Sequence, residues 1–395
     1  HERGITIPIA AVALGAKVIE KHVTLDKTLE GNDHRVSLLP EEFKSMVKGI
    51  RQVEEAIGNS NDRVLSRGEV MNRESLAKSL VASIDINKNE IINESMVSIG
   101  SPGQGMQPNL LHSIIGKKIL RKKAKGELYF LNDFENEMIK PRSFDFDMKW
   151  GIPVRYHDLH ALKEMSNMDL FEIHLSYKDM ELDFREFIKE PLDYDLVVHA
   201  PELFSGDHTL DLCTKDEVYR KRSVLELQRV INLTRELAEY FTKAERPCIV
   251  TNVGGFSSDS HMDPRHRQGY YNILEVTLKE LDMEGVELII QTMPPYPWHF
   301  GGQQFHNLFM DSESIVDFCE RNKMRICFDI SHSKLACNHY RWDFDEFVKK
   351  VMPYTAHLHI ADSEGVDGEG LQIDEGDINW EAFSNNIYPY SSSVS

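Results

Sequence analysis

The sequence predicts an α/β protein built around (β/α) barrels, and three observations lead to this. From about residue 148 onward, seven short apolar segments of strand type alternate with helical stretches. Near the start, an alanine-rich apolar helix is followed by a β-branched segment, which is typical of one more β/α step. Between these regions, short strand signals and turn residues prevail. We therefore expect four parts: an N-terminal β/α segment (1–58), a small β-rich domain (62–135), a linker (136–147) and an incomplete (β/α) barrel (148–395).

Composition narrows the functional classes. The 395 residues suggest two to three domains, and 41% hydrophobic and 9% aromatic residues are ordinary for a soluble globular protein. A formal net charge of −19 argues against nucleic-acid binding, which needs a basic surface. The five cysteines are odd in number and form no CxxC pair, which favours reduced thiols and a cytoplasmic location. No apolar run is long enough to suggest a membrane span.

The first predicted elements place polar side chains at the end of a strand. Ile7–Leu14 reads as a helix packed on a sheet, and Gly15 occupies the position where a helix often ends in a left-handed conformation. Lys17–Thr24 reads as a strand, in which Glu20 and His22 share one face. In β/α barrels the chemistry collects at the carboxyl ends of the strands. A solvated edge strand, or a core histidine paired with a neighbour, is the alternative interpretation.

Residues 1–58 resemble the C-terminal part of the barrel of sialic acid synthases and their legionaminate and pseudaminate relatives. His1, the Glu20-Lys21-His22 motif and the segment Gly31–Leu38 carry the resemblance. It implies that His1 and His22 hold a divalent metal, usually Mn²⁺ or Mg²⁺. It also implies that Asp33 contacts sugar hydroxyls, and Glu20 lies where it can orient a water or a sugar hydroxyl.

The reaction that this resemblance implies is the condensation of phosphoenolpyruvate with an open-chain N-acylated hexosamine, a transferase step of nonulosonic acid biosynthesis. A metal on two neutral imidazoles suits it, because it polarises the aldehyde oxygen as a Lewis acid. The family's phosphate-binding residues lie on earlier barrel strands, which this sequence does not contain. We therefore expect this chain alone to be inactive as a synthase, even if its parent protein is active.

The second region has the order of a small β-rich domain. Ser79–Ser83 reads as a strand, Asn87–Asn89 as a turn and Ser101–Pro108 as a loop. Two more short strands are predicted at Gly116–Leu120 and Leu128–Leu131.

This region resembles the antifreeze-like (SAF) domain of sialic acid synthases, most specifically in its Pro-Gly-x-Gly-x-x-Pro loop. The resemblance implies a domain-swapped homodimer in which this domain caps the partner's active site. It places Lys78 where the family uses an arginine to reach the sugar's N-acyl group. Lysine keeps the charge but lacks the planar fork of arginine, and a surface lysine is the alternative interpretation.

The third region supplies the strands of the second barrel. The predicted strands are Trp150–Tyr156, Leu170–His174, Asp195–His199, Cys248–Val253, Val286–Thr292, Arg325–Ile330 and Ala356–Ala361. Helices are predicted between them, for example at Lys221–Phe241 and Ser312–Asn322. An eighth strand is expected beyond Ser395, because the last residues do not have a strand pattern.

Polar residues end strand after strand of this region: Glu172, His174, His199, Asn252, Gln291, Asp329, His332, His357, His359 and Asp362. A set of this kind on one barrel rim favours a functional site over isolated core histidines.

The strand ends resemble those of the xylose-isomerase-like barrels, which include sugar-phosphate isomerases, epimerases and endonuclease IV. The matching segments are Val198–Pro201, Phe328–His332, His357–Asp362 and Gly370–Trp380.

This second resemblance implies a divalent metal held by carboxylates and a histidine from the later strands. Asp329 and His359 fit that pattern, while Gln291 stands where a glutamate is expected. A carboxamide ligates through oxygen but brings no charge. His199 and His332 complete the predicted rim. Two interpretations remain open: a metal-dependent sugar isomerase or epimerase, and a degenerate, non-catalytic carbohydrate-binding barrel.

Overall fold

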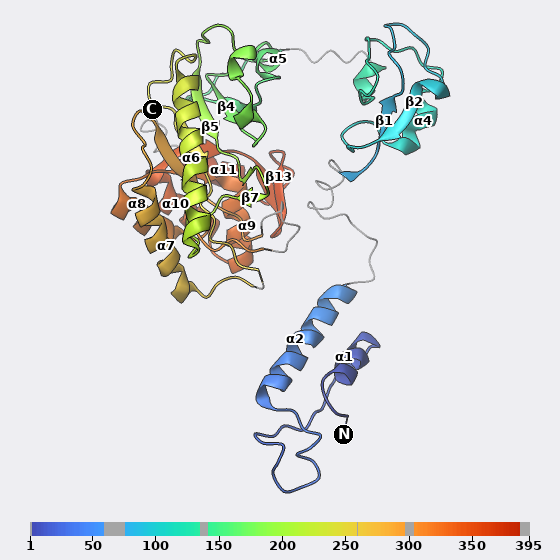
Figure 1. Cartoon of the computed structure of the whole chain (residues 1–395), viewed down its shortest axis with the longest axis vertical. Coiled ribbons are helices and arrows are strands. Elements are labelled where there is room, and N and C mark those ends of the chain that lie inside the picture. Colours follow the sequence, from blue (N-terminus) through green and yellow to red (C-terminus); the bar gives the residue numbers. More distant parts are fainter. Residues whose placement is uncertain (1, 59–75, 135–140, 259, 297–303, 388–395) are drawn as a thin grey trace. The chain divides into compact units, whose positions relative to one another are not determined.

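The computed structural model describes residues 2–58, 76–134, 141–258, 260–296 and 304–387 (Figure 1). The chain divides into two units, His1–Val64 and Leu65–Ser395.

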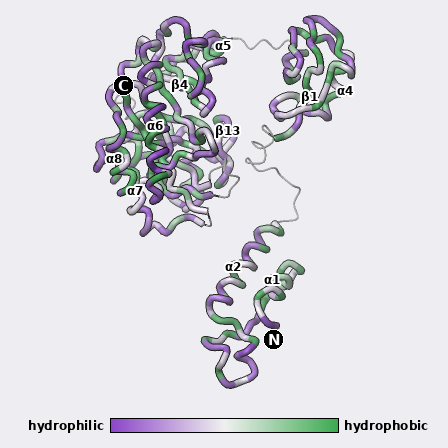
Figure 2. Tube along the Cα trace, viewed as in Figure 1, coloured by the Kyte–Doolittle hydropathy of each residue, from purple (hydrophilic) through white to green (hydrophobic). Residues whose placement is uncertain are grey.

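The first unit consists of two packed helices and a long loop. Helix α1 spans Thr6–Ala13, and Gly15 follows it with φ +100°, so the predicted helix and its left-handed end are confirmed. Helix α2 spans Pro40–Ile57 and begins with a proline in its first turn. The two helices lie so close that a Cβ built on Gly49 of α2 would be 2.6 Å from Ile9 Cδ1 of α1. The hydrophobic residues of α1 appear green in Figure 2.

The predicted strand Lys17–Thr24 is wrong. The segment forms a single parallel bridge, Val23 with Leu38, supported by hydrogen bonds from Thr24 N to Leu38 O (3.0 Å) and from Leu38 N to His22 O (2.8 Å). A strand persists only where a neighbour satisfies its backbone groups. Among residues 2–58, only the segment around Leu38 pairs with it.

Residues 76–134 form a small domain with its own core. Strand β1 (Ser79–Ala82) pairs antiparallel with β2 (Val97–Gly100). Short helices complete it: η1 (Glu94–Met96), η2 (Pro108–Leu110), α4 (Leu111–Ile114) and η3 (Leu131–Asp133). The core contains Leu80, Ile86, Ile114, Ile119 and Tyr129.

Two of the predicted strands in this domain shrink to single bridges. Lys118 bridges Ile91, and Leu128 bridges Val81. The turn prediction is confirmed, since Asn89 adopts a left-handed φ of 70°.

The third region contains a seven-stranded parallel sheet whose strands follow in chain order. Its strands are β3 (Gly151–Val154), β4 (Leu170–His174), β5 (Asp195–His199), β8 (Cys248–Thr251), β9 (Glu287–Gln291), β10 (Ile326–Asp329) and β11 (Thr355–His359). Each falls within or next to its predicted segment. Strands β3 and β11 form the two edges of this sheet. The eighth strand stays a prediction.

Helices connect and cover these strands: α5 (Leu159–Lys163), α6 (Glu217–Ala238), α7 (Pro264–Leu278), α8 (Ser312–Asn322), α9 (Ile330–Tyr340), α10 (Phe344–Val351) and α11 (Trp380–Ile387). Three short 3₁₀ helices of this region are η4 (Asp179–Glu181), η5 (Phe184–Glu186) and η7 (Met352–Tyr354). Two hairpins pair β6 (Leu203–Phe204) with β7 (His208–Thr209) and β12 (Asp362–Glu364) with β13 (Gly368–Leu371). The main core lies between helices and sheet, with Phe171, Val198 and Phe328 fully buried in it. No described helix has both the length and the apolar character that a membrane span requires.

The sheet is curled like a barrel. Glu172 of β4, the second strand, accepts hydrogen bonds from His357 and His359 of β11, the seventh strand. In a flat sheet of this order, four strands would separate these side chains. Closure of this kind gathers the carboxyl ends of the strands around one interior, as in a (β/α) barrel.

Candidate functional site

The side chains that face the barrel interior form an apolar layer followed, toward the carboxyl ends of the strands, by a polar layer. Five residues form an apolar interior cluster: Leu170, Val197, Val250, Ile289 and Cys327. Two positions later on each chain segment stand five polar residues: Glu172, His199, Asn252, Gln291 and Asp329. Because alternate residues of a strand share a face, this polar layer also faces the interior, toward the carboxyl ends of the strands.

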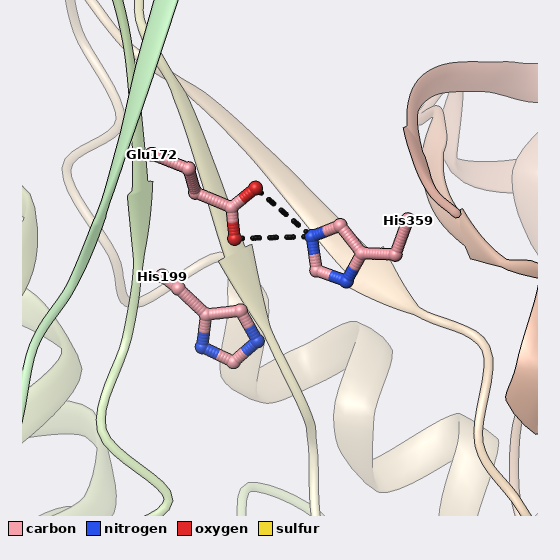
Figure 3. A group of neighbouring side chains, drawn as sticks. All are labelled: Glu172, His199 and His359. Carbon is pink, nitrogen blue, oxygen red and sulfur yellow. Dashed lines mark hydrogen bonds and ion pairs between the residues drawn. The ribbon is translucent and has the colours of Figure 1, made fainter. Parts of the chain in front are cut away.

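Glu172 is the centre of one half of the polar layer. It is 5% exposed, and its carboxylate accepts hydrogen bonds from His174 Nε2 (2.7 Å), His357 Nε2 (2.8 Å) and His359 Nε2 (3.0 Å). Figure 3 shows Glu172 pointing toward His359, with the ring of His199 beside both. The carboxylate therefore holds histidines from two strands that lie far apart in the sheet.

These contacts fix the charges of the group. Burial alone would raise the pKa of Glu172, but the charge of His359 and the hydrogen bonds from the three histidines lower that pKa well below its usual range. Burial opposes a charge on His359, whereas Cys327, Glu172 and Asp329 raise its pKa well above the ordinary value. Burial and the neighbouring His174 lower the pKa of His199 to about 4. At neutral pH His199 is therefore neutral and has a free nitrogen lone pair.

Asp329 is the centre of the other half. Its Oδ2 accepts a hydrogen bond from Gln291 Nε2 (2.9 Å) and lies 3.3 Å from His359 Nδ1. Burial opposes its charge, but His332 and His359 lower the pKa of Asp329 to about 2. The hairpin β12–β13 supplies Glu369, whose carboxylate lies 3.0 Å from His332 Nε2. Burial lowers the pKa of His332, yet Asp329 and Glu369 raise it to about 9.

Glu172 and His199 of the polar layer, together with His359 of β11, have the spacing of a metal site. One potential ligand atom each from Glu172, His199 and His359 lies within 4.8 Å of the others. Two imidazoles and one carboxylate suit Zn²⁺, Fe²⁺ or Mn²⁺. The neutral His199 and the ionised Glu172 are already in the protonation states that a metal requires, while His359 has to lose a proton.

The predicted second-barrel residues are brought together by the fold. Gln291, Asp329 and His359 contact one another, with Gln291 Nε2 3.1 Å from His359 Nδ1. Gln291 Oε1 faces His199 Nε2 at 3.3 Å. The predicted ligand set omitted Glu172, which the structure places at the centre of the group. Its position two residues before His174, at a strand end, was the available signal.

A cavity of about 1030 Å³ extends from the amino ends of the strands, where Asp195, Glu287 and Arg325 line it, to Glu172 and His359 of this group. Its lining includes Glu172, His174, His357 and His359 together with apolar residues of the edge strands such as Ile152 and Leu358. This volume is ample for a ligand of the size of a sugar.

The residues predicted in the first unit lie on its surface. His22 and Asp33 are 41% and 62% exposed, and His22 Nδ1 is 3.7 Å from Asp33 Oδ2. Glu20 is exposed as well. His1 lies outside the described residues, so its pairing with His22 at a metal stays a prediction.

Lys78 lies on the surface of the small domain. It donates a hydrogen bond to Ser101 Oγ (2.8 Å) and lines a hollow of about 270 Å³ with Gly103, Gln107 and Pro108 of the predicted loop. Its contact with an N-acyl group stays a prediction.

Comparison with known proteins identifies the barrel. A family model described as xylose isomerase-like TIM barrel matches residues 159–388. The chain belongs to the xylose isomerase-like TIM barrel family. A crystal structure of a D-tagatose 3-epimerase-like protein is 23% identical, with a TM-score of 0.44, and covers 61% of this chain and 86% of that one.

The region before the xylose isomerase-like barrel has a different relationship. Residues 1–62 match the NeuB family model. Human N-acetylneuraminate-9-phosphate synthase is 44% identical over 122 residues, which are 30% of this chain and 33% of the synthase. The N,N'-diacetyllegionaminic acid synthase of Campylobacter jejuni is 42% identical over 128 residues, 32% of this chain and 38% of the enzyme. The chain thus spans about a third of the length of the curated relatives it matches, and it joins a synthase-like region to the xylose isomerase-like barrel.

Proposed function

We propose that the barrel is a divalent-metal-dependent enzyme that isomerises or epimerises a sugar in nonulosonic acid biosynthesis. The observation that carries this proposal is the group Glu172, His199 and His359, whose potential ligand atoms lie within 4.8 Å of one another at the carboxyl ends of three strands. Sugar chemistry is supported by family membership, and the pathway by the synthase-like region on the same chain.

In this proposal Glu172, His199 and His359 would hold the metal, and Asp329 and Gln291 could add oxygen ligands. A metal held there would supply Lewis-acid polarisation of a carbonyl oxygen of the sugar, which would acidify the neighbouring C–H bond. His174 is 38% exposed and lines the cavity, so it is placed to contact the substrate. His332 contacts the Thr292 carbonyl oxygen through Nδ1 and the Glu369 carboxylate through Nε2, so it holds the β12–β13 hairpin against the carboxyl ends of the strands.

Hydrogen exchange in heavy water tests this function. The protein, supplied with Mn²⁺, is incubated with ketoses and N-acylated hexosamines, and deuterium uptake beside the carbonyl is followed by NMR. We expect uptake that Glu172→Gln abolishes and that His22→Ala, a change in the other unit, leaves unchanged. Sugar binding without exchange would instead favour a non-catalytic carbohydrate-binding barrel, an alternative suggested by Gln291 in place of an acidic ligand.

For the N-terminal region, we propose that it is part of a synthase-type enzyme that condenses phosphoenolpyruvate with an N-acylated hexosamine and works as a domain-swapped dimer. In that setting His1 and His22 bind Mn²⁺ or Mg²⁺, Asp33 and Lys78 contact the sugar, and Glu20 orients a reacting group. We expect the 395-residue chain to consume no phosphoenolpyruvate by itself. A phosphate-release assay with Mn²⁺ and N-acylated hexosamines checks this, and product formation would refute it.

A further inference from the structure

Asn252 is a buried side chain that the hydrogen-bond network of the barrel leaves out. It is 3% exposed, and neither its Nδ2 nor its Oδ1 has a hydrogen-bond partner among the described residues. Within the part of the chain that the structure describes, Asn252 is the residue with two such atoms. A buried amide without partners is costly, so this position calls for a group that satisfies it.

The sheet register shows where the amide of Asn252 lies. Val250 of β8 faces the interior, and Asn252 follows it by two residues, on the same face. Strands β8 and β9 pair Thr251 with Ile290, so the next positions along these strands are Asn252 and Gln291. Gln291 contacts His199, Asp329 and His359. The unpaired amide is therefore next to the candidate metal group, in the same polar layer.

The backbone around Asn252 holds it in place. Thr251 Oγ1 donates to the Asn252 carbonyl oxygen (2.8 Å), and the chain then turns through Gly254 and Gly255, both with left-handed φ (+81° and +78°). A Cβ on Gly254 would lie 2.4 Å from Asp211 Oδ1, so the turn admits only glycine there. The backbone that carries Asn252 is therefore fixed, while both polar atoms of its side chain are available to a ligand.

We propose that Asn252 binds a hydroxyl group of the sugar substrate. A carboxamide offers a donor and an acceptor, and a sugar hydroxyl also donates and accepts, so one hydroxyl or two neighbouring ones satisfy both atoms of Asn252. This assignment rests on the sugar-directed function proposed above and adds a specificity residue to it. A site built to pair a substrate hydroxyl discriminates strongly against analogues that lack it.

The test compares two buried asparagines replaced by leucine, which has a similar shape. In Asn252→Leu an unpaired amide disappears, so we expect a Tm about 2 °C or more above wild type. Asn307 is the matched control: it is 1% exposed, donates to Gly255 O (2.8 Å) and Ser257 Oγ (2.9 Å), and accepts from Met262 N (2.6 Å). Asn307→Leu loses these bonds, so its Tm is expected to fall.

The second readout is sugar binding by the Mn²⁺-supplied protein, with D-fructose and N-acetylglucosamine at tens of millimolar as probes. We expect at least one probe to raise the Tm of the wild type and to bind Asn252→Leu about tenfold more weakly. A lower Tm for Asn252→Leu, an unchanged affinity, or no response of the wild type to either sugar overturns the proposal. Deuterium exchange is scored separately: sugar binding through Asn252 without exchange refutes the isomerase and leaves this inference standing.

Discussion

Replacement of Glu172 by glutamine tests whether this carboxylate holds the polar layer together. The substitution keeps the shape of the side chain but removes its charge. Three imidazole N–H groups, from His174, His357 and His359, then lose a charged acceptor. A charge-assisted hydrogen bond contributes about 2 kcal/mol and a neutral one about 1, so the three together predict a loss of about 3 kcal/mol. This agrees with the range of about 3–5 kcal/mol for breaking a buried ion pair.

The assay is urea unfolding in the presence of a chelator, followed by tryptophan fluorescence. All four tryptophans lie at position 150 or later, so the signal reports on the barrel. Glu164→Gln is the control, because the side chain of Glu164 is 75% exposed. A change below about 1 kcal/mol for Glu172→Gln at pH 6 would refute the reasoning.

The pH dependence gives this prediction a second check. The lowered pKa of Glu172 means that its contribution is present above the unfolded carboxyl value and is lost as the pH falls through the folded value. The raised pKa of His359 means that its contribution is complete below about pH 6.5 and is lost as the pH rises through the folded value. The difference between wild type and Glu172→Gln is therefore largest from about pH 5 to pH 6.5 and narrows on either side. A difference that stays constant from pH 3 to pH 10 would contradict the assigned charges.

Two further predictions concern the frame around the site. Asp362 is fully buried and accepts hydrogen bonds from Trp380 Nε1 (2.9 Å) and from the backbone N–H groups of Ser363 (2.8 Å) and Asp374 (3.0 Å). Asp362→Asn should therefore lower the free energy of unfolding in urea by about 2–4 kcal/mol and change the tryptophan signal. An effect no larger than that of the surface change Asp367→Asn would refute this prediction. Glu287 accepts two hydrogen bonds of 2.8 Å from the Arg325 guanidinium, which lowers the pKa of Glu287. Glu287→Gln should therefore lower the free energy of unfolding by about 1 kcal/mol at pH 7, and by nothing once the pH has fallen below the folded pKa. Equal losses of stability at pH 7 and at acid pH would argue against this prediction.

The strands of the barrel were predictable because each has a clear local pattern and also has neighbouring strands to pair with. Leu170–His174 and Asp195–His199 were predicted with their observed bounds, since each is an apolar β-branched or aromatic run that ends at a polar residue. Lys17–Thr24 has the same local pattern but forms no strand, because strand formation also depends on a neighbour that supplies hydrogen bonds.

The composition of the site was less predictable than its location. The polar strand ends identify the rim, but the sequence does not say which of them meet across the barrel. Glu172 and His359 are 187 positions apart and belong to the second and seventh strands, so their contact depends on how the sheet curls. The unpaired state of Asn252 was equally hidden, since the hydrogen bonds of an asparagine become known only when its neighbours are placed.

Metal content measures the central claim most directly. The protein is equilibrated with Mn²⁺ or Zn²⁺, dialysed, and analysed by mass spectrometry of the elements. We predict about one metal ion per chain in the wild type and in His22→Ala, and loss of that ion in Glu172→Gln and His359→Ala, because both residues belong to the only described group with ligand spacing. A wild type without stoichiometric metal, or a metal that survives both barrel substitutions and disappears in His22→Ala, would contradict the account.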